Sequence, residues 1–347
     1  MIDESNIDKA ALIRALDYHY PIQPRQADFF PYGWVSACYV IECADGSKYF
    51  LKLHDDESFV PFAASDRDFY LDLSYNLRTQ SILSDIAYPI LNHENGLISP
   101  FGGFDLILFN FIEGKVLGFD GLPEDVLAEV ARLMGILHRN GLMAVGDHRF
   151  VESFDIGLEA VLLQSLEDLK IIATNNASQA KRDLSELLLS HEQALLALLD
   201  CLKMYRDLAI AAGKDMVVCH TDLHGGNMIR DPTGTLHILD WENAMIAPPE
   251  HDLFAYVGWE RFWDLFLPIY ESEFGPADLN TAVFGFYLYR RNLEDLADYV
   301  VRILHTDQGD EQDQEDLRQI QSACMAGWPY LEPTITSIAE KLDQLTA

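Results

Sequence analysis

Polar and hydrophobic positions alternate in two nearby stretches of the first third of the chain, as expected for half-buried strands. These stretches are residues 34–41 and 48–53, and the turn-forming residues 44–47 separate them. Because that turn contains Asp45-Gly46, the pattern predicts a hairpin. A further strand is predicted over residues 104–112, which are mostly apolar.

Helical periodicity dominates the rest of the chain. Apolar residues recur every three or four positions in two segments of the first third and in two longer regions after it. The predicted helices cover residues 6–19, 66–84 and 123–139, and two more lie within 157–210 on either side of residues 174–178. This change of pattern after Gly114 places a boundary between an N-terminal lobe, residues 1–112, and a C-terminal lobe, residues 113–347.

Two short apolar runs near the middle of the chain each adjoin polar residues. Asp222 and Asn227 follow the first run, Asp240 ends the second, and an Asp-Pro-Thr-Gly turn at 231–234 connects them. Two carboxylates and an amide are oxygen ligands of the kind that Mg²⁺ prefers. Lys52, within a predicted strand, could neutralise nucleotide phosphates. The parts and their order fit a protein-kinase-like division of labour.

The composition limits the partners of the chain. With 24 basic and 56 acidic residues the formal charge is −32, which argues against nucleic acid or an anionic membrane and favours cationic small molecules. The five cysteines form no C-x-x-C pair, the first residues are acidic, and no apolar run is long enough to span a membrane. We therefore expect a cytoplasmic protein that is a monomer or a weak homodimer.

Three motifs resemble those of the aminoglycoside phosphotransferase family, and their residues are most similar to those of its spectinomycin phosphotransferase branch. They are His220-x-Asp222-x-x-x-x-Asn227, Ile238-Leu239-Asp240-Trp241 and Ala247-Pro248-x-Glu250-x-Asp252-Leu253, with Arg291-x-Leu293-Glu294-Asp295 on a later helix. The resemblance implies an α+β, bilobal protein-kinase-like fold. Its small N-lobe would hold an antiparallel sheet, and its larger C-lobe would be mostly helical.

The resemblance also implies a role for each matching residue. Asp222 would be the catalytic base, Asn227 and Asp240 the Mg²⁺ ligands, and His220 and Asp252 scaffold residues of the catalytic loop. The predicted ATP or GTP contacts are Lys52, Gly33 and Ser36 for the phosphates, and Asn110, Phe111, Ile112 and Leu239 for the base.

The chain departs from the family pattern at two points. The phosphate loop, residues 32–36, has one glycine, and the helix predicted over 66–84 lacks the glutamate that normally pairs with the strand lysine. Asp72 is the substitute that we expect for that glutamate.

The substrate side is less specific. Glu242 and Asp155 are candidate carboxylates for a cationic amino sugar, as is the segment 250–252, and Trp241 is a candidate ring platform beside them. An aminoglycoside or aminocyclitol is one substrate class, and metabolites of the choline, homoserine, methylthioribose or sugar-amine type are another. Two further readings remain: a catalytically degenerate nucleotide-binding module, and a metal-dependent hydrolase that uses His220, Asp222 and His224.

Overall fold

The computed structural model describes residues 7–31, 36–55, 65–118, 121–172, 177–306 and 308–346. It forms two compact units. The first comprises residues 1–151, 217–246 and 265–275, and the second 152–216, 247–264 and 276–347. The lobe boundary expected after residue 112 falls inside the first unit, and the division into lobes stays a prediction.

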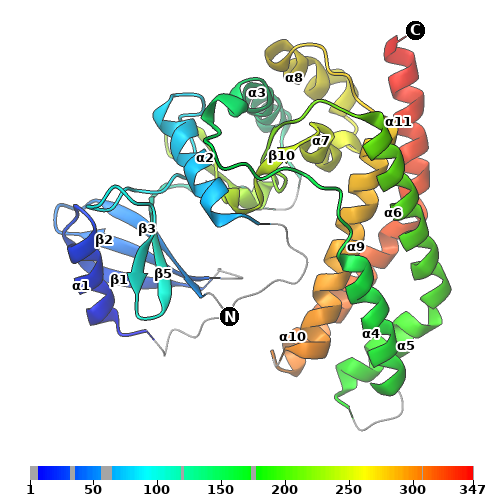
Figure 1. Cartoon of the computed structure of the whole chain (residues 1–347), viewed down its shortest axis with the longest axis horizontal. Helices are drawn as coiled ribbons and strands as arrows, with labels where there is room; N and C mark the ends of the chain where they lie inside the picture. Colours follow the sequence, from blue (N-terminus) through cyan, green and yellow to red (C-terminus); the bar gives the residue numbers. More distant parts are fainter. Residues whose placement is uncertain are drawn as a thin grey trace. The chain divides into compact units, whose positions relative to one another are not determined.

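A five-stranded antiparallel sheet opens the first unit (Figure 1). Its order is β1-β2-β3-β5-β4, with β1 at Pro24–Phe30, β2 at Ala37–Cys43, β3 at Lys48–Asp55, β4 at Ser99–Phe101 and β5 at Phe104–Asn110. The predicted hairpin is β2–β3, and Gly46 adopts a φ of +85° at its turn. The sequence pattern did not indicate β1, since this edge strand is largely exposed and its residues do not alternate cleanly.

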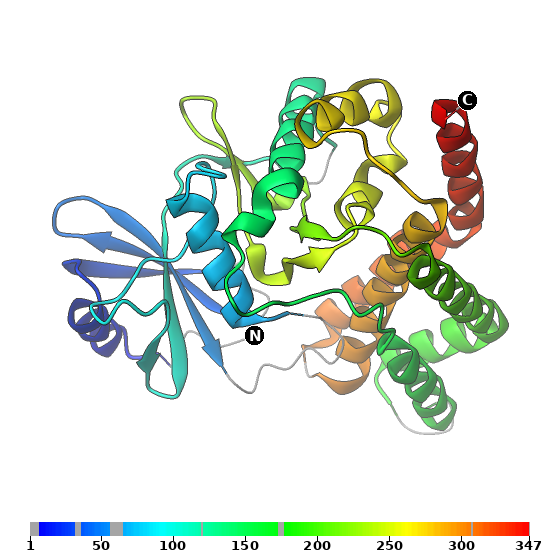
Figure 2. The same ribbon diagram turned by 45° about the horizontal axis from the view of Figure 1, so that its top comes forward.

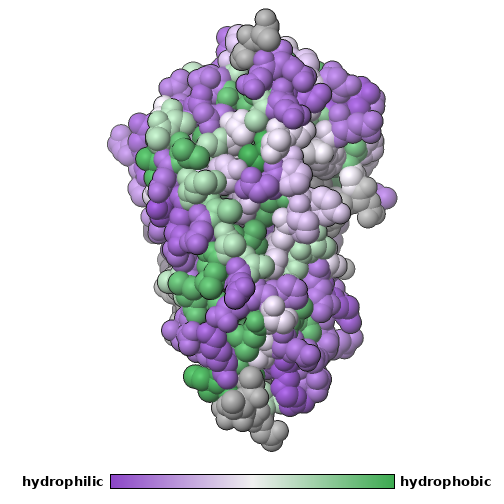
Figure 3. Space-filling model, turned by 90° about the vertical axis from the view of Figure 1, so that its right-hand side faces the viewer, coloured by the Kyte–Doolittle hydropathy of each residue, from purple (hydrophilic) through white to green (hydrophobic). Residues whose placement is uncertain are grey.

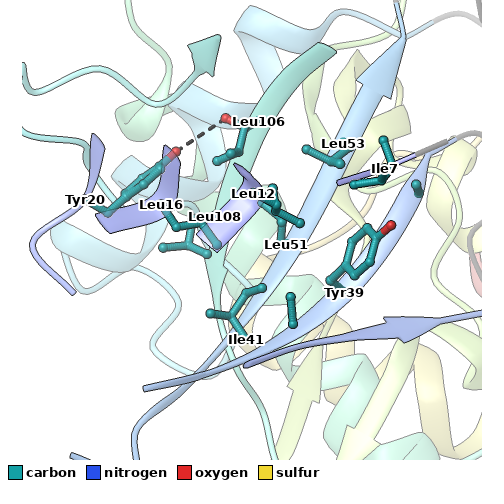
Figure 4. Close-up of a cluster of buried hydrophobic side chains, with 12 residues drawn as sticks. Ile7, Leu12, Leu16, Tyr20, Tyr39, Ile41, Leu51, Leu53, Leu106 and Leu108 are labelled. Carbon is teal, nitrogen blue, oxygen red and sulfur yellow. Dashed lines mark hydrogen bonds between the residues drawn. The ribbon is translucent and has the colours of Figure 1, made fainter. Parts of the chain in front are cut away.

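Helix α1 (Lys9–His19) covers one face of this sheet (Figure 2). Leu12 and Leu16 of the helix pack with sheet residues such as Leu51 and Leu53, all fully buried (Figure 4). The Tyr20 hydroxyl closes the cluster by donating to the Leu106 carbonyl at 3.3 Å. Because side chains alternate along a strand, Lys52 lies on the opposite face from this core.

The remainder of the first unit carries short strands and three longer helices. The strands are β6 (Lys115–Val116), β7 (Val217–Cys219), β8 (Met228–Arg230), β9 (Leu236–Ile238) and β10 (Met245–Ala247); β6, β8 and β9 form one small sheet, and β7 pairs with β10. The helices are α2 (Arg67–Thr79), α3 (Glu124–Asn140) and α8 (Leu267–Phe274), with 3₁₀ turns η2 (Gly141–Ala144), η3 (Gly225–Asn227) and η4 (Trp241–Asn243). Helix α2 ends five residues earlier than predicted. The α+β class is confirmed.

The second unit is helical throughout its described regular structure. It contains α4 (Leu158–Ile172), α5 (Gln179–Ser190), α6 (Glu192–Ala212), α7 (Glu250–Val257), α9 (Thr281–His305), α10 (Asp310–Gln319) and α11 (Leu331–Thr346), with shorter turns η5 (Phe262–Phe266), η6 (Ile320–Cys324) and η7 (Met325–Tyr330). The region 157–210 forms three helices instead of two, because the chain breaks again at His191.

Helix α9 is the centre of the second unit, and α4, α6, α7, α10 and α11 all pack against it. On the outside of these helices, exposed apolar residues such as Met204 and Leu208 are scattered among polar ones. Figure 3 shows this mixture on the face that it presents, where hydrophobic residues are interrupted by hydrophilic ones. Within the described ranges, the helices are all too short or too polar to cross a lipid bilayer.

A buried charged cluster ties α9 to the start of the second unit. The Arg290 guanidinium donates to Glu152 Oε2 at 2.8 Å and to His251 Nε2 at 2.9 Å. The His251 ring stacks on Tyr287 with ring centroids 4.0 Å apart. Burial, reinforced by the Arg290 charge, holds the pKa of His251 well below its usual range, so its imidazole is neutral.

Candidate active site

The loop that follows β7 is built around the buried ring of His220. Its Nε2 donates to the Leu239 carbonyl at 2.7 Å, and the ring lies against Trp241, with centroids 4.8 Å apart. The main-chain N–H of Asp222 approaches His220 Nδ1 at 3.4 Å. This fully buried imidazole therefore joins the loop after β7 to the turn after β9, as a scaffold residue would.

Asp222 and Asn227 contact each other directly. The Asn227 amide nitrogen donates to the Asp222 carbonyl at 2.9 Å and to its carboxylate at 3.1 Å. These two bonds fix the side-chain amide and assign its other atom, Oδ1, as the oxygen that could bind a cation. His224 also lies in this group, since its Nε2 is 3.5 Å from the Asp222 carboxylate and its Nδ1 accepts from Gly226 at 3.0 Å.

The short helix η3, which carries Asn227, packs so closely that one of its residues must be glycine. A Cβ on Gly225 would lie 2.0 Å from the main-chain oxygen of Gly118. We expect Gly225→Ala to lower the free energy of unfolding by about 1–3 kcal/mol and to impair turnover, because η3 must move away. Chemical unfolding and steady-state rates check this. Gly146→Ala is the matched control, since nothing lies within 4 Å of its Cβ.

Asp240 follows β9 in the left-handed conformation, with φ 59° and ψ 68°. Aspartate tolerates this conformation better than most residues. The preceding residue, Leu239, donates its N–H to the Asn227 carbonyl at 2.9 Å. The strand end thus holds Asp240 in register with the loop that carries Asn227.

Lys52 reaches both acidic residues of this turn from β3. Its ammonium is 2.9 Å from Asp240 Oδ1 and 2.5 Å from Glu242 Oε1. Burial alone would lower the pKa of Lys52, but the two carboxylates outweigh it and hold that pKa well above its usual value. Burial also opposes ionisation of Asp240, yet the adjacent ammonium keeps the pKa of Asp240 below its ordinary range. Lys52 therefore remains a cation at neutral pH.

The expected pairing of Lys52 with Asp72 is wrong. Asp72 is exposed on α2, and the described ion pairs of Lys52 go to Asp240 and Glu242 instead. Sequence reasoning assigned Glu242 to the substrate and so missed its place beside the lysine. The D-x-E spacing after β9 was the signal that could have indicated this, because a tight turn can direct both carboxylates toward the same lysine.

The predicted nucleotide residues lie near the ends of the sheet strands. Asn110 ends β5, and its main-chain N–H already donates to the Tyr88 carbonyl at 3.2 Å. Phe111 and Ile112 follow directly after the strand. Ser36 is buried just before β2. Gly33 lies outside the described residues, and the predicted roles of this group stay predictions.

The predicted substrate residues differ in their surroundings. Trp241 is only 3% exposed and packs on His220, so it offers no ring platform on the surface. Asp155 is exposed in the second unit, whereas Glu250 and Asp252 of that unit are buried. Neither buried carboxylate is available to contact a substrate, and Asp252 fits better as the scaffold residue that its motif implies.

Glu250 makes the folding stability of the protein depend on pH. Its Oε1 accepts the Asn280 N–H at 2.7 Å, while Oε2 has no hydrogen-bond partner in the described parts of the chain. Burial raises its pKa to about 7 from an ordinary value of 4.5. The folded protein therefore binds more protons than the unfolded chain between these pH values, and stability falls as the pH rises through that window.

We expect Glu250→Gln to remove this loss. The amide keeps the bond to Asn280 without a charge, so the variant should be more stable than the wild type by up to about 3 kcal/mol at pH 8 and nearly equal at pH 4.5. Urea unfolding at both pH values checks the prediction. Glu260→Gln, at an exposed position of the same unit, is the matched control. An equal effect of Glu250→Gln at both pH values would contradict it.

The donor set fits a divalent cation. Asp240 and Asn227 offer carboxylate and amide oxygens, and the Asp240–Glu242 pair already surrounds a positive charge, that of Lys52. Asp222 stands against Asn227 as a carboxylate able to accept a proton. A strand lysine, a carboxylate bonded to an amide, and a second carboxylate are, in this order and on this fold, the residue types expected of a kinase-like phosphotransferase that acts on a hydroxyl group.

The chain belongs to the phosphotransferase enzyme family designated APH, whose model matches residues 29–287. Solved structures share the fold at low sequence identity. Spectinomycin phosphotransferase APH(9)-Ia, in complex with ADP and spectinomycin, is 18% identical with a TM-score of 0.73, and the match covers 91% of this chain and 94% of that one.

Two other structures extend this comparison. An aminoglycoside phosphotransferase from Alicyclobacillus acidocaldarius is 16% identical (TM-score 0.58; coverage 99% and 98%). The choline kinase LicA from Streptococcus pneumoniae is 15% identical (TM-score 0.54; coverage 90% and 99%). No curated protein sequence matches this chain at a significant level. The predicted kinase-like fold and phosphotransferase class are confirmed.

Proposed function

We propose that this protein transfers the γ-phosphoryl group of Mg²⁺-bound ATP or GTP to a hydroxyl of a small cationic molecule. The observation that carries the proposal is the connected group in the first unit: Asp222 bonded to Asn227, and Lys52 bonded to Asp240. Each residue type matches one requirement of phosphoryl transfer, which depends on positioning and charge stabilisation.

The residues of this group divide the work. Asp222 would orient the acceptor hydroxyl and take its proton, and the bond from Asn227 holds its carboxylate in place. Asn227 and Asp240 would hold Mg²⁺, which, when bound, neutralises charge on the nucleotide phosphates. The Lys52 ammonium would balance the remaining phosphate charge, and its raised pKa keeps it protonated for that purpose.

Charge supports a cationic substrate. The chain carries a formal charge of −32, so its surface attracts cations and repels anions other than those that it binds specifically. The similar structures act on or bind spectinomycin, choline and, in the case of a microcompartment-associated kinase, aminopropanol. All three compounds combine a hydroxyl with a basic or quaternary nitrogen. We infer the same combination for the substrate of this protein.

A screen for ADP or GDP release tests the proposal. Purified protein is incubated with Mg²⁺-ATP or Mg²⁺-GTP and with one compound at a time from two panels. The first contains spectinomycin and aminoglycosides, and the second contains choline, amino alcohols and sugar amines. Substrate-dependent release supports the proposal, and the responding panel separates antibiotic modification from metabolism. Nucleotide binding without transfer to any compound would favour the degenerate module, and tightly bound Zn²⁺ would favour the hydrolase.

A further inference from the structure

Three acidic residues lie in or beside α2, and none of them forms a described ion pair with Lys52. Asp66 caps the helix by accepting the Phe69 N–H at 3.0 Å and also binds His148 at 2.8 Å. Asp68 and Asp72 are exposed. The Tyr70 side chain of α2 is 2% exposed, and burial together with the charge of Glu242 raises the pKa of its hydroxyl, so the hydroxyl is neutral. None of the described acidic residues of α2 forms an ion pair with Lys52.

Glu242 occupies the place left by the missing helix carboxylate. It makes the shorter of the two Lys52 contacts, at 2.5 Å, and its side chain is 22% exposed against 44% for Asp240. Its main-chain carbonyl accepts the Ser65 hydroxyl at 2.7 Å, at the entrance to α2. Two anchors thus hold Glu242, whereas Asp240 is the more accessible carboxylate.

His54 cannot compete for Glu242 as a charged partner. Its Nε2 is 3.8 Å from Glu242 Oε1, but burial and the positive charges of Lys52 and Arg67 lower the pKa of His54 to about 4. The imidazole is neutral at physiological pH, so the positive charge beside Glu242 comes from Lys52.

We propose that Glu242 is the positioning residue for Lys52, in place of the helix carboxylate that protein-kinase-like enzymes normally use. This inference rests on the proposed function. It assigns separate tasks to the two acids of one turn: Asp240 would hold the Mg²⁺ of the nucleotide, and Glu242 would keep the lysine aligned with the phosphates. The lysine is then aligned from the turn after β9, which the Ser65 hydroxyl joins to the start of α2.

A double-mutant cycle on Lys52 and Glu242 tests the assignment. Glu242→Gln preserves the shape of the side chain, and we expect it to lower kcat/KM for the nucleotide by roughly tenfold, within the range for residues in direct contact. In a Lys52→Met background the same change should have almost no further effect, because Glu242 acts through the lysine. A full additional loss in that background, or no loss in the single variant, would overturn the proposal.

A second readout does not require catalysis. In the nucleotide-free protein, the rate at which an amine-acylating reagent modifies Lys52 is followed by mass spectrometry. Glu242→Gln should raise this rate several-fold, because one of two carboxylates no longer engages the ammonium, whereas Asp72→Asn should leave it unchanged. Equal rates in all three proteins, each with wild-type thermal unfolding, would contradict the role of Glu242. This result can be obtained even if the substrate screen fails, so the two proposals fail separately.

Discussion

Turnover of the Asp222→Asn variant is expected to fall by about a hundred- to ten-thousand-fold, the range found when a general base is lost. The amide cannot take a proton from the acceptor hydroxyl. Its oxygen can still accept the bond that Asn227 donates to the wild-type carboxylate at 3.1 Å, so the loop should keep its conformation. Steady-state rates with the substrate found by the ADP-release screen measure the loss.

Nucleotide affinity is the internal control for this variant. Because Lys52 and Asp240 are untouched, calorimetric titration with Mg²⁺-ATP should give a dissociation constant within a few-fold of the wild type. A variant that binds nucleotide normally and also keeps wild-type turnover would show that Asp222 is not the base. A variant that loses both properties would point to a collapsed loop instead of a missing proton acceptor.

Loss of Arg290 is expected to have the largest effect on stability. Arg290→Met should lower the free energy of unfolding by about 3–5 kcal/mol, because Glu152 would keep its charge in a buried site without its counter-ion. The side chain of Glu152 is 3% exposed, and its other described hydrogen bonds come from the Phe154 N–H at 2.7 Å and the Tyr287 hydroxyl at 3.3 Å, with the neutral His251 ring 3.8 Å away. These two neutral donors do not replace a guanidinium. Urea unfolding at pH 7 measures the change.

The neighbouring residue on α9 is a matched control. Arg291 pairs with Asp295 at 3.1 Å, but its side chain is 43% exposed. Arg291→Met should therefore cost no more than about 1 kcal/mol, the usual value of a surface ion pair. Similar losses for the two variants would mean that the buried cluster contributes no more to stability than a surface ion pair does.

The parts of the fold that could be predicted were those with strong local patterns. The β2–β3 hairpin carries alternation on both sides of an Asp-Gly turn, and the long helices carry regular apolar faces. Strand β1 was missed because its residues are mostly exposed, so its sequence lacks the alternation of apolar and polar residues that a half-buried strand shows. The break at His191 was missed because apolar spacing continues on both sides of it.

In the site, too, residues within one local motif could be predicted, whereas contacts that depend on the tertiary fold could not. Asp222, Asn227 and Asp240 belong to a compact motif whose spacing implies their chemistry, and Lys52 follows from the order of the parts. The partner of Lys52 was misjudged, because it depends on how a turn 190 residues away meets β3. Acidic residues on α2 were plausible by sequence position, but their direction on the helix decides whether they reach the lysine.

The left-handed backbone at Asp240 affects which residues the fold would accept at this position. A glycine there would relieve a conformation that costs a non-glycine residue of order 1 kcal/mol. It would also delete the carboxylate that pairs with Lys52 at 2.9 Å and that we propose as a Mg²⁺ ligand. Backbone strain alone therefore favours glycine at this position, whereas the ion pair and the proposed metal site require the aspartate. Under the proposed mechanism, a homologue with glycine here would lack one ligand of the metal.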